Sequence, residues 1–325
     1  MSDISTKIVE LLSGVYVIPG ATNIGVILNQ KSMHSEVYLV DSGCTEIDAD
    51  YILSILETFF AQRKEKYKIR AIINTHGHTD HSGANSFIQK KTGCQVWAPL
   101  LEVSGIENPL LQATEIWGGM PPHEIQTSYF KQTPSKVSRI INEEVKIRLS
   151  DRKSISFLTL PGHCFEMTAV IFHDRNDKKV VFAGDGIFTR DELSKHWIPY
   201  MYNPLLFLES LDKLELLKDV AWCIPSHGDF IKRNLHETIE MDKLAILETK
   251  TLLLNLIASG KKTTEELLKK VADLNEIKLG FGQSVLIQST LKSYLAGLHD
   301  RGEIKVLIEN NRFYWCENPE RNSTR

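Results

Sequence analysis

The sequence predicts an α/β fold followed by a second, smaller and mostly helical module. Three observations predict it. Short apolar runs alternate with amphipathic segments over roughly the first two thirds of the chain, single metal-binding side chains follow several of these runs, and the pattern becomes helical after Phe230. A chain of 325 residues is also long enough for two units. We therefore expect a first domain over residues 1–235 and a second over residues 236–325.

Apolar runs rich in β-branched residues and bounded by Gly, Pro, Asn and Ser predict the strands of the first half. They span residues 14–19, 23–29, 36–43, 69–76 and 95–99. The spacing of Ile52, Ile55, Leu56, Phe59 and Phe60 predicts a helix over residues 48–62, and residues 82–93 are expected to form a helix that ends at Gly93.

Residues 100 to about 140 interrupt this alternation, because the segment is rich in Gly, Pro and aromatic residues. A long loop of this kind inside a domain is typical of a functional element such as a substrate lid. Strands are then predicted over residues 145–149, 154–163, 168–173 and 179–186, a helix over 205–220, and a strand and turn over 221–229.

The C-terminal part has helical periodicity. Helices are predicted over residues 236–258, 263–273 and 283–304, the second of them capped by Thr263 and Thr264 with Glu three positions on. A hairpin over residues 305–317 is expected to turn at Asn310 and Asn311. Three helices and a terminal hairpin resemble a winged-helix module.

The bulk composition excludes several classes of protein. The net charge of -3 provides no overall positive field for nucleic acid or an anionic membrane. No window approaches the roughly 18 consecutive apolar residues of a membrane span, and the N-terminus lacks a signal-peptide pattern. The five cysteines are scattered without a C-x-x-C pair, which is typical of reduced thiols. We expect a soluble, cytoplasmic protein.

The stretch THGHTDHSGA, from Thr75 to Ala84, holds three histidines and an aspartate within six positions. A strand ends at Thr75, and Gly77 would let the chain turn sharply, so alternating side chains could converge. Imidazole and carboxylate groups are ligands that Zn²⁺ accepts. The cluster indicates a metal site more strongly than it indicates an exposed polar loop.

Three further candidate ligands follow predicted strands, each beside a glycine: His163, Asp185 and His227. A single histidine after a strand is more often structural than metal-binding. Open α/β sheets, however, place their sites at the carboxyl ends of strands, and three such residues accompany a cluster that already favours metal.

The cluster from His76 to His81, followed by His163, Asp185 and His227, resembles in order and spacing the metallo-β-lactamase superfamily in its glyoxalase II-like, dinuclear form. The likeness covers roughly residues 10–235, and it implies a four-layer αβ/βα sandwich with the site at one edge. Carried over position by position, His76, His78 and His163 would bind one metal, Asp80, His81 and His227 would bind the other, and Asp185 would bridge both.

Two positions, His78 and Asp185, distinguish between branches of this superfamily. Oxygen-reducing diiron relatives carry an acid where this chain has His78, and the zinc enzymes that accept penicillins carry cysteine where it has Asp185. Both point to two zinc ions per chain, and iron or manganese is compatible with the same ligands. After His163 the chain has Cys164-Phe165-Glu166 instead of the usual Thr-Pro-Gly, so a substrate preference is not carried over. Cys164 is expected to be a small buried residue more than a metal contact.

The resemblance implies a hydrolase that uses a bridging hydroxide on a small ester, thioester or lactone, with Asp80 holding the hydroxide and moving its proton. A metal-dependent endoribonuclease or phosphodiesterase, and a ligand-sensing DNA-binding regulator, are the alternatives. Aromatic and polar residues of two segments are the candidate substrate-binding residues: Trp117, His123, Tyr129, His196, Tyr200 and Tyr202.

The second domain favours packing or dimerisation over nucleic-acid binding. Residues 236–325 contain 13 Lys and Arg against 13 Asp and Glu, whereas a nucleic-acid module usually has a basic excess. We expect a small-molecule substrate and no membrane partner. A nucleic-acid partner is disfavoured but left open, and so is a homodimer.

Overall fold

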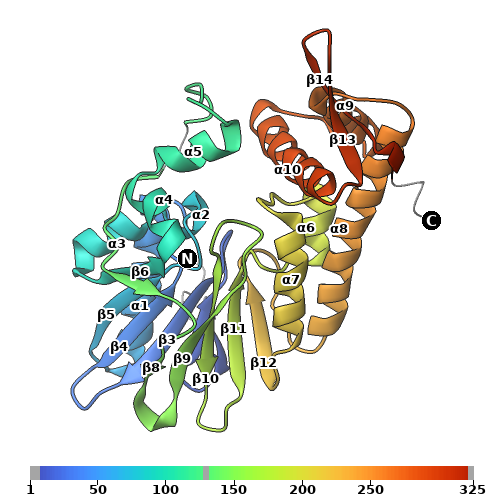
Figure 1. Ribbon diagram of the computed structural model, residues 1–325. Coiled ribbons are helices and arrows are strands. Elements are labelled where there is room, and N and C mark those ends of the chain that lie inside the picture. The colour runs from blue at the N-terminus through green and yellow to red at the C-terminus, as the bar shows by residue number, and fades with distance from the viewer. Residues whose placement is uncertain (1–7, 127–131, 321–325) are drawn as a thin grey trace.

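Two β-sheets packed face to face form the centre of the protein, and helices cover both outer faces (Figure 1). The computed structural model describes residues 8–126 and 132–320. The first sheet has seven strands in the order β1-β2-β3-β4-β5-β6-β7, and the second has five in the order β12-β11-β10-β9-β8. This mixed α/β fold is consistent with the four-layer sandwich that the resemblance implies.

The first sheet begins as an antiparallel meander and continues as a parallel sheet. Its strands are β1 (Val9–Leu12), β2 (Val15–Ile18), β3 (Ile24–Gln30), β4 (Ser35–Val40), β5 (Tyr67–Ile73), β6 (Gln95–Pro99) and β7 (Arg139–Ile141). The parallel crossover from β4 to β5 is made by α1 (Glu46–Arg63), which a capping box of Thr45 and Asp48 begins and a left-handed Lys64 ends. Helices α2 (Thr79–Ser82) and α3 (Asn85–Thr92) connect β5 to β6.

The second sheet consists of β8 (Ile147–Arg148), β9 (Ser154–Thr159), β10 (Thr168–His173), β11 (Lys179–Gly184) and β12 (Val220–Pro225). Strand β10 is antiparallel to both β9 and β11, and β11 is parallel to β12. Strands β9, β11 and β12 therefore run in the same direction and end at the same edge. Helices α6 (Arg190–His196) and α7 (Pro204–Glu215) form the crossover from β11 to β12.

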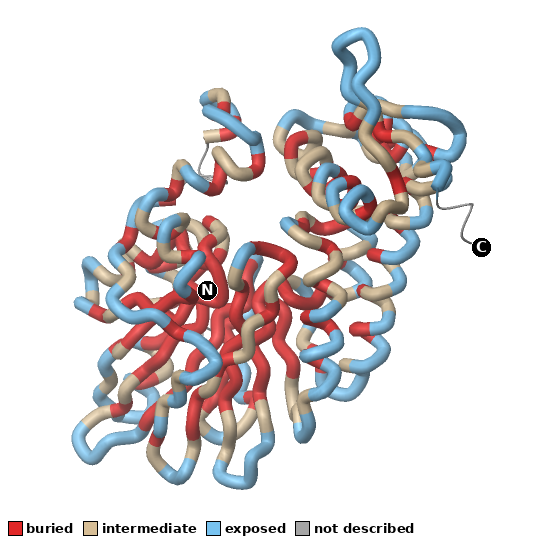
Figure 2. The backbone as a smooth tube through the Cα atoms, viewed as in Figure 1, coloured by how far each residue is buried: buried red, intermediate tan, exposed pale blue. Residues whose placement is uncertain are grey.

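Alternating side chains explain why the two sheets pack against each other and also against helices. On β3, Ile27 faces the core between the sheets, whereas Val26 and Leu28 face the core beneath α1 and α3. Figure 2 shows the consequence, with buried residues filling the central strands of both sheets and exposed residues mostly on loops, outer helix faces and the C-terminal hairpin.

The segment expected to be a loop from residue 100 to about 140 is more ordered than its composition suggests. It contains a 3-10 turn (Leu100–Glu102) and two helices, α4 (Val103–Glu107) and α5 (Leu110–Trp117), before β7. Ala113 and Ile116 of α5 are buried against Val285 of the C-terminal part. Burial against a distant part of the chain is a tertiary effect that the local composition did not reveal.

The C-terminal part contains α8 (Leu235–Ala258), α9 (Thr264–Leu274), α10 (Phe281–Asp300), and a hairpin of β13 (Ile304–Glu309) and β14 (Arg312–Glu317). The hairpin turns at Asn310 and Asn311, both of which have positive φ, as the sequence predicts. The apolar core of this part is continuous with the outer face of the second sheet. The division at residue 235 and the winged-helix character remain predictions.

None of the helices in the described part of the chain is long and apolar enough to span a bilayer. None of the five cysteines, all of which lie within the described residues, forms a disulfide.

Candidate metal centre

The sheet topology brings the candidate ligands together. His76 follows β5 of the first sheet, and His163, Asp185 and His227 follow β9, β11 and β12 of the second. Because these strands end at one edge of the sandwich, residues far apart in the sequence become neighbours. The edge is tied together across the sheets, since the Thr168 N–H donates to the Thr75 carbonyl at 2.8 Å.

The cluster after β5 is not the simple tight loop that the sequence suggests. Asp80 and His81 lie in the short helix α2, which begins after His78. Gly77 does not have positive φ; a Cβ there would come within 3.2 Å of Glu102, whose carboxylate accepts the Gly77 N–H at 3.0 Å. The glycine is needed for the close approach of Glu102, and that contact holds the turn.

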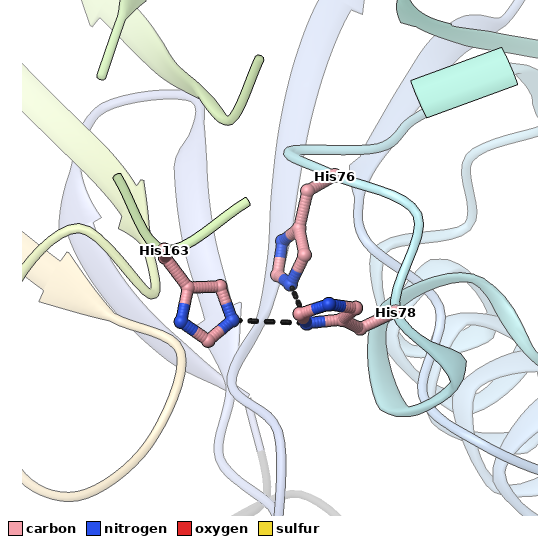
Figure 3. A group of neighbouring side chains, drawn as sticks. All are labelled: His76, His78 and His163. Atoms are coloured by element: carbon pink, nitrogen blue, oxygen red, sulfur yellow. Dashed lines mark hydrogen bonds between the residues drawn. The ribbon is translucent and has the colours of Figure 1, made fainter. Parts of the chain in front are cut away.

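Three histidines form the first group of converging ligands (Figure 3). Nδ1 of His78 lies 3.0 Å from Nε2 of His76 and 2.9 Å from Nε2 of His163. Three ring nitrogens that face one another at such distances suit a shared cation better than any arrangement of their own protons.

A second group lies beside the first and consists of Asp80, His81 and His227. Nε2 of His227 is 3.2 Å from the Asp80 carboxylate. Asp185 lies between the two groups, since its carboxylate is 3.2 Å from Nε2 of His163, 3.6 Å from that of His81 and 3.5 Å from that of His227. All seven residues carried over from the resemblance therefore meet at one place.

Hydrogen bonds on the outer side of the rings set the tautomers of the histidines. Nδ1 of His163 donates to the Tyr200 carbonyl at 2.9 Å, and Nδ1 of His227 donates to the Ala21 carbonyl at 2.7 Å. Nδ1 of His81 donates to Asp41 at 3.0 Å. In the neutral rings this leaves the lone pair of Nε2 directed inward, which is the usual arrangement around a metal.

The tautomer of His76 is set in the same way, but the Thr75 hydroxyl lies between its ring and the carboxylate of Asp41. The Thr75 hydroxyl donates to Asp41 at 2.8 Å, so its oxygen accepts a proton from Nδ1 of His76 at 3.1 Å. Asp41 also accepts the Thr75 N–H at 2.8 Å. One buried carboxylate thereby orients a ligand of each group.

Two buried atoms in the centre have no hydrogen-bond partner within the described chain: Nε2 of His81 and Oδ1 of Asp185. A buried polar atom without a partner is costly and rare. Both atoms point into the space between the ligands, where a cation would satisfy them. The residues present therefore fit a metal centre.

The protonation behaviour of the centre agrees with this fit. Burial lowers the pKa of His78 and of His163 to about 4, so these rings are neutral near pH 7. Burial opposes charge on His81 as well, but Asp80, Asp185 and Asp41 together raise its pKa well above the ordinary value. A proton and a metal ion would compete for that ring, since ligands must be deprotonated to bind.

A pocket of about 320 Å³ opens beside the centre, and we call it the metal-side pocket. Its lining includes His78, Leu101, Leu111, Glu115, Cys164 and Phe165. Cys164 is buried, and it faces Glu102, whose nearby charge together with burial raises the pKa of the thiol well above its ordinary value. As expected, Cys164 is a small buried residue, and its thiol interacts with carboxylates outside the candidate ligand set.

The candidate substrate-binding residues divide into two groups. Tyr200 lies close to the centre, with its ring centroid 5.7 Å from that of His78, and Tyr202 packs on Phe165 at 4.4 Å. Trp117 instead contacts Phe281 at 6.0 Å, and His123 is exposed. None of these four residues lines the metal-side pocket itself. Tyr129 lies outside the described residues, and so does the side chain of His196, at the end of α6.

Two residues that sequence reasoning missed are prominent here. Asp41 directly follows β4, but it lies inside the strand predicted over residues 36–43 and has no glycine next to it, so the rule that selected Asp185 did not find it. Glu115 lies on α5 and accepts the Tyr200 hydroxyl at 3.3 Å, and burial and the charge of Glu102 raise its pKa to about 7. Nothing in the sequence around Glu115 signals this position.

A four-layer α/β sandwich with seven converging histidines and aspartates defines a class of metal-dependent enzymes. The model of the metallo-beta-lactamase superfamily matches residues 17–227. The chain belongs to the metallo-beta-lactamase superfamily, whose members are generally metal-dependent hydrolases that bind divalent metals, usually zinc.

Solved structures share the fold of this chain. A beta-lactamase domain protein from Burkholderia ambifaria superimposes with a TM-score of 0.72 and 17% identity, covering 96% of this chain and 94% of that one. A metallo-beta-lactamase family protein from Thermus thermophilus gives 0.71 and 21%, covering 95% of this chain and 100% of that one. These two likenesses in fold extend over the C-terminal part as well.

Among curated sequences, an uncharacterized protein from Aquifex aeolicus is 29% identical over 174 residues, which is 52% of this chain and 67% of that protein. An uncharacterized protein from Mycobacterium tuberculosis is 25% identical over 172 residues, which is 51% of this chain and 72% of that one.

Proposed function

We propose that the protein is a dinuclear metal-dependent hydrolase of the glyoxalase II-like type. His76, His78 and His163 would hold one ion, Asp80, His81 and His227 the second, and Asp185 both. The observation that carries this proposal is the pair of buried unpartnered atoms, Nε2 of His81 and Oδ1 of Asp185, in the middle of the ligand set.

Zinc is the metal we propose, since imidazole nitrogens and carboxylate oxygens suit it. Iron and manganese accept similar ligands, so occupancy follows availability as well as ligand type. When bound, the two ions would supply a water of lowered pKa and polarise the substrate's carbonyl oxygen, so that its carbonyl carbon is more electrophilic.

The chain's own residues would orient the reactants. Asp80 is the most exposed of the candidate ligands around the second ion, with a side chain 34% exposed against 0% for His81 and 24% for His227. It can accept a hydrogen bond from the attacking water and take its proton. Asp41 and the carbonyls of Tyr200 and Ala21 hold the histidine rings so that Nε2 keeps its lone pair.

The substrate we propose is a small ester, thioester or lactone. A mainly apolar pocket of about 320 Å³ against His78 supports a small, partly apolar acyl group. The test is a panel of thioesters, lactones, aryl esters and nitrophenyl phosphodiesters on zinc-loaded protein. Turnover of acyl compounds, lost in His78→Ala, supports the proposal; turnover of phosphodiesters alone would replace it with the phosphodiesterase alternative.

We propose that the C-terminal part is a winged-helix-like domain that packs on the catalytic domain and shapes the pocket. Its core is continuous with that of the second sheet, and its charges balance. We expect no binding to duplex DNA or single-stranded RNA even at low salt, measured by fluorescence anisotropy. Tight binding that weakens steeply with salt would support a nuclease or a regulator instead.

A further inference from the structure

A second cavity, of about 580 Å³, lies next to the metal-side pocket, and we call it the α10 pocket. Its walls are the segment from Tyr200 to Leu205 and one face of α10. Glu115 lines both cavities, and its hydrogen bond to the Tyr200 hydroxyl marks the boundary between them. A molecule bound over His78 could therefore extend in either direction.

The α10 pocket is held at a defined place relative to the candidate ligands. The Tyr200 carbonyl accepts Nδ1–H of His163 at 2.9 Å, and the Tyr202 N–H donates to the His163 carbonyl at 3.1 Å. The Asn203 N–H donates to the carbonyl of Gly162 at 2.8 Å. The wall of the pocket is thus bonded directly to the loop that carries a ligand.

One face of α10 forms the opposite wall. Its residues recur at helical spacing: Ser289, Lys292, Ser293, Ala296, Gly297 and Asp300. Gly297 allows the helix to lie close to the first turn of α7, since a Cβ there would be 3.0 Å from Leu205 Cδ1. Small side chains along this face leave the volume of the cavity open.

Two cations, Lys292 and Arg301, line this cavity together with two acids, Glu115 and Asp300. The acidic residues next to Arg301 in the sequence have other partners: Asp300 lies 3.6 Å from Nδ1 of His299, and Glu303 lies 2.6 Å from Nζ of Lys250. Asn203 uses its side-chain oxygen to cap α7, which leaves its amide N–H groups as donors. The cavity therefore offers two cations and amide donors beside two carboxylates, of which Glu115 already accepts the Tyr200 hydroxyl.

We propose that the α10 pocket binds an anionic arm of the substrate, a carboxylate or a phosphate, while an apolar group occupies the metal-side pocket. The inference rests on the proposed hydrolase and names its substrate class: an ester or thioester that is apolar on one side of the scissile bond and anionic on the other. Water cleaves the acyl–oxygen or acyl–sulfur bond and gives a carboxylic acid and an alcohol or thiol.

The test compares matched octanoyl thioesters of 6-mercaptohexanol, 6-mercaptohexanoate and 6-mercaptohexyl phosphate on zinc-loaded protein. We expect kcat/KM to be about two- to fivefold higher for an anionic arm than for the neutral alcohol, through KM, because ion pairs of exposed side chains such as Lys292 and Arg301 are weak. The preference should shrink as salt rises. Comparison of the carboxylate and phosphate arms identifies which anion the cavity prefers. A second comparison, between hexanethiol thioesters of suberate and of octanoate, tests whether the anion is instead preferred on the acyl side of the scissile bond.

Variants assign the preference to the cavity. Lys292→Ala with Arg301→Ala should bring the ratio of anionic to neutral kcat/KM close to one, and Lys292→Glu should invert it. Lys270→Ala, an exposed lysine on α9 outside the cavity, is the matched control and should keep the wild-type ratio.

Two outcomes would overturn the inference. The first leaves the proposed hydrolase function intact, and the second overturns that function as well. If the neutral thioester is hydrolysed and the ratio is near one, or survives in the double variant, the α10 pocket does not bind the anion and the hydrolase stands. If no ester, thioester or lactone is hydrolysed by the zinc-loaded protein, the proposed function fails together with this inference.

Discussion

At the scale of the residue, the centre depends on groups that touch no substrate. The carboxylate of Asp41 accepts three hydrogen bonds, from Nδ1 of His81 and from both the N–H and the hydroxyl of Thr75. It has positive φ, at 62°, a conformation that aspartate and asparagine tolerate better than most residues. Its role is to orient two histidines, one in each group.

Asp41→Asn should weaken zinc binding by about 10- to 100-fold, because the amide retains the shape but cannot accept all three hydrogen bonds. Competition with a chromophoric chelator measures the affinity. Asp151→Asn is the control, since Asp151 also has positive φ but is exposed and remote from the centre. Equal affinities in wild type and Asp41→Asn would refute the orienting role.

The raised pKa of Glu115 predicts that the stability of the folded protein depends on pH. Burial and the charge of Glu102 raise its pKa to about 7 from an ordinary 4.5, so the folded protein holds this proton more tightly than the unfolded chain. Its contribution to stability is complete below about pH 4.5 and is lost as the pH rises through about 7, by on the order of 1–3 kcal/mol.

Glu115→Gln should therefore lose less stability than wild type between pH 5 and pH 7.5. Guanidinium unfolding of both proteins at the two pH values, with chelator present so that metal binding does not contribute, measures the difference. An unchanged pH dependence in the glutamine variant would show that Glu115 does not titrate in this range.

At the scale of the element, the ligand loops are held by neighbouring helices. Gly162, with a φ of 135°, passes so close to α7 that a Cβ would lie 2.4 Å from the Phe207 nitrogen. The loop after β11, which carries Asp185, is held from the C-terminal part. Asp242 of α8 is buried and accepts the Phe188 N–H at 2.8 Å, and burial raises its pKa well above the ordinary value.

Asp242→Ala should destabilise the protein by about 1–3 kcal/mol, because the buried Phe188 N–H loses its acceptor. Asp242→Asn keeps an oxygen in place and avoids a buried charge, so it should cost less, above all at alkaline pH. Guanidinium unfolding at pH 8 compares the two. Equal losses would mean that α8 does not hold the loop through this hydrogen bond.

At the scale of the molecule, the sequence predicted the elements and site residues whose pattern lies within a short stretch of the chain. The period-2 strands, the helix over 48–62 and the hairpin at Asn310 follow from neighbouring residues, and the histidine cluster carries its own chemistry. Helix α5 was missed because its order comes from burial of Ala113 and Ile116 against α10, which no local pattern encodes. Glu115 and the α10 pocket depend on the same long-range contact.

Metal removal should act on the whole fold. Without an ion, the acidic and imidazole groups of the centre are buried against one another, and a ligand that binds only the folded state stabilises it by mass action. Zinc added to chelator-treated protein should raise Tm by about 5 °C or more in differential scanning fluorimetry. His236→Ala should show the same shift, because the acidic neighbours of His236, Glu215 and Glu240, already pair with Lys243. A Tm that does not change with zinc would contradict a metal centre in the folded protein.

The most direct test of the central claim is the metal content of the purified protein after zinc loading and exhaustive dialysis, measured by elemental analysis. Two ions sharing Asp185 predict about two zinc per wild-type chain, two in His236→Ala, and at most one in Asp185→Asn. A wild-type chain that retains no metal, or an Asp185→Asn chain that still retains two, would contradict it.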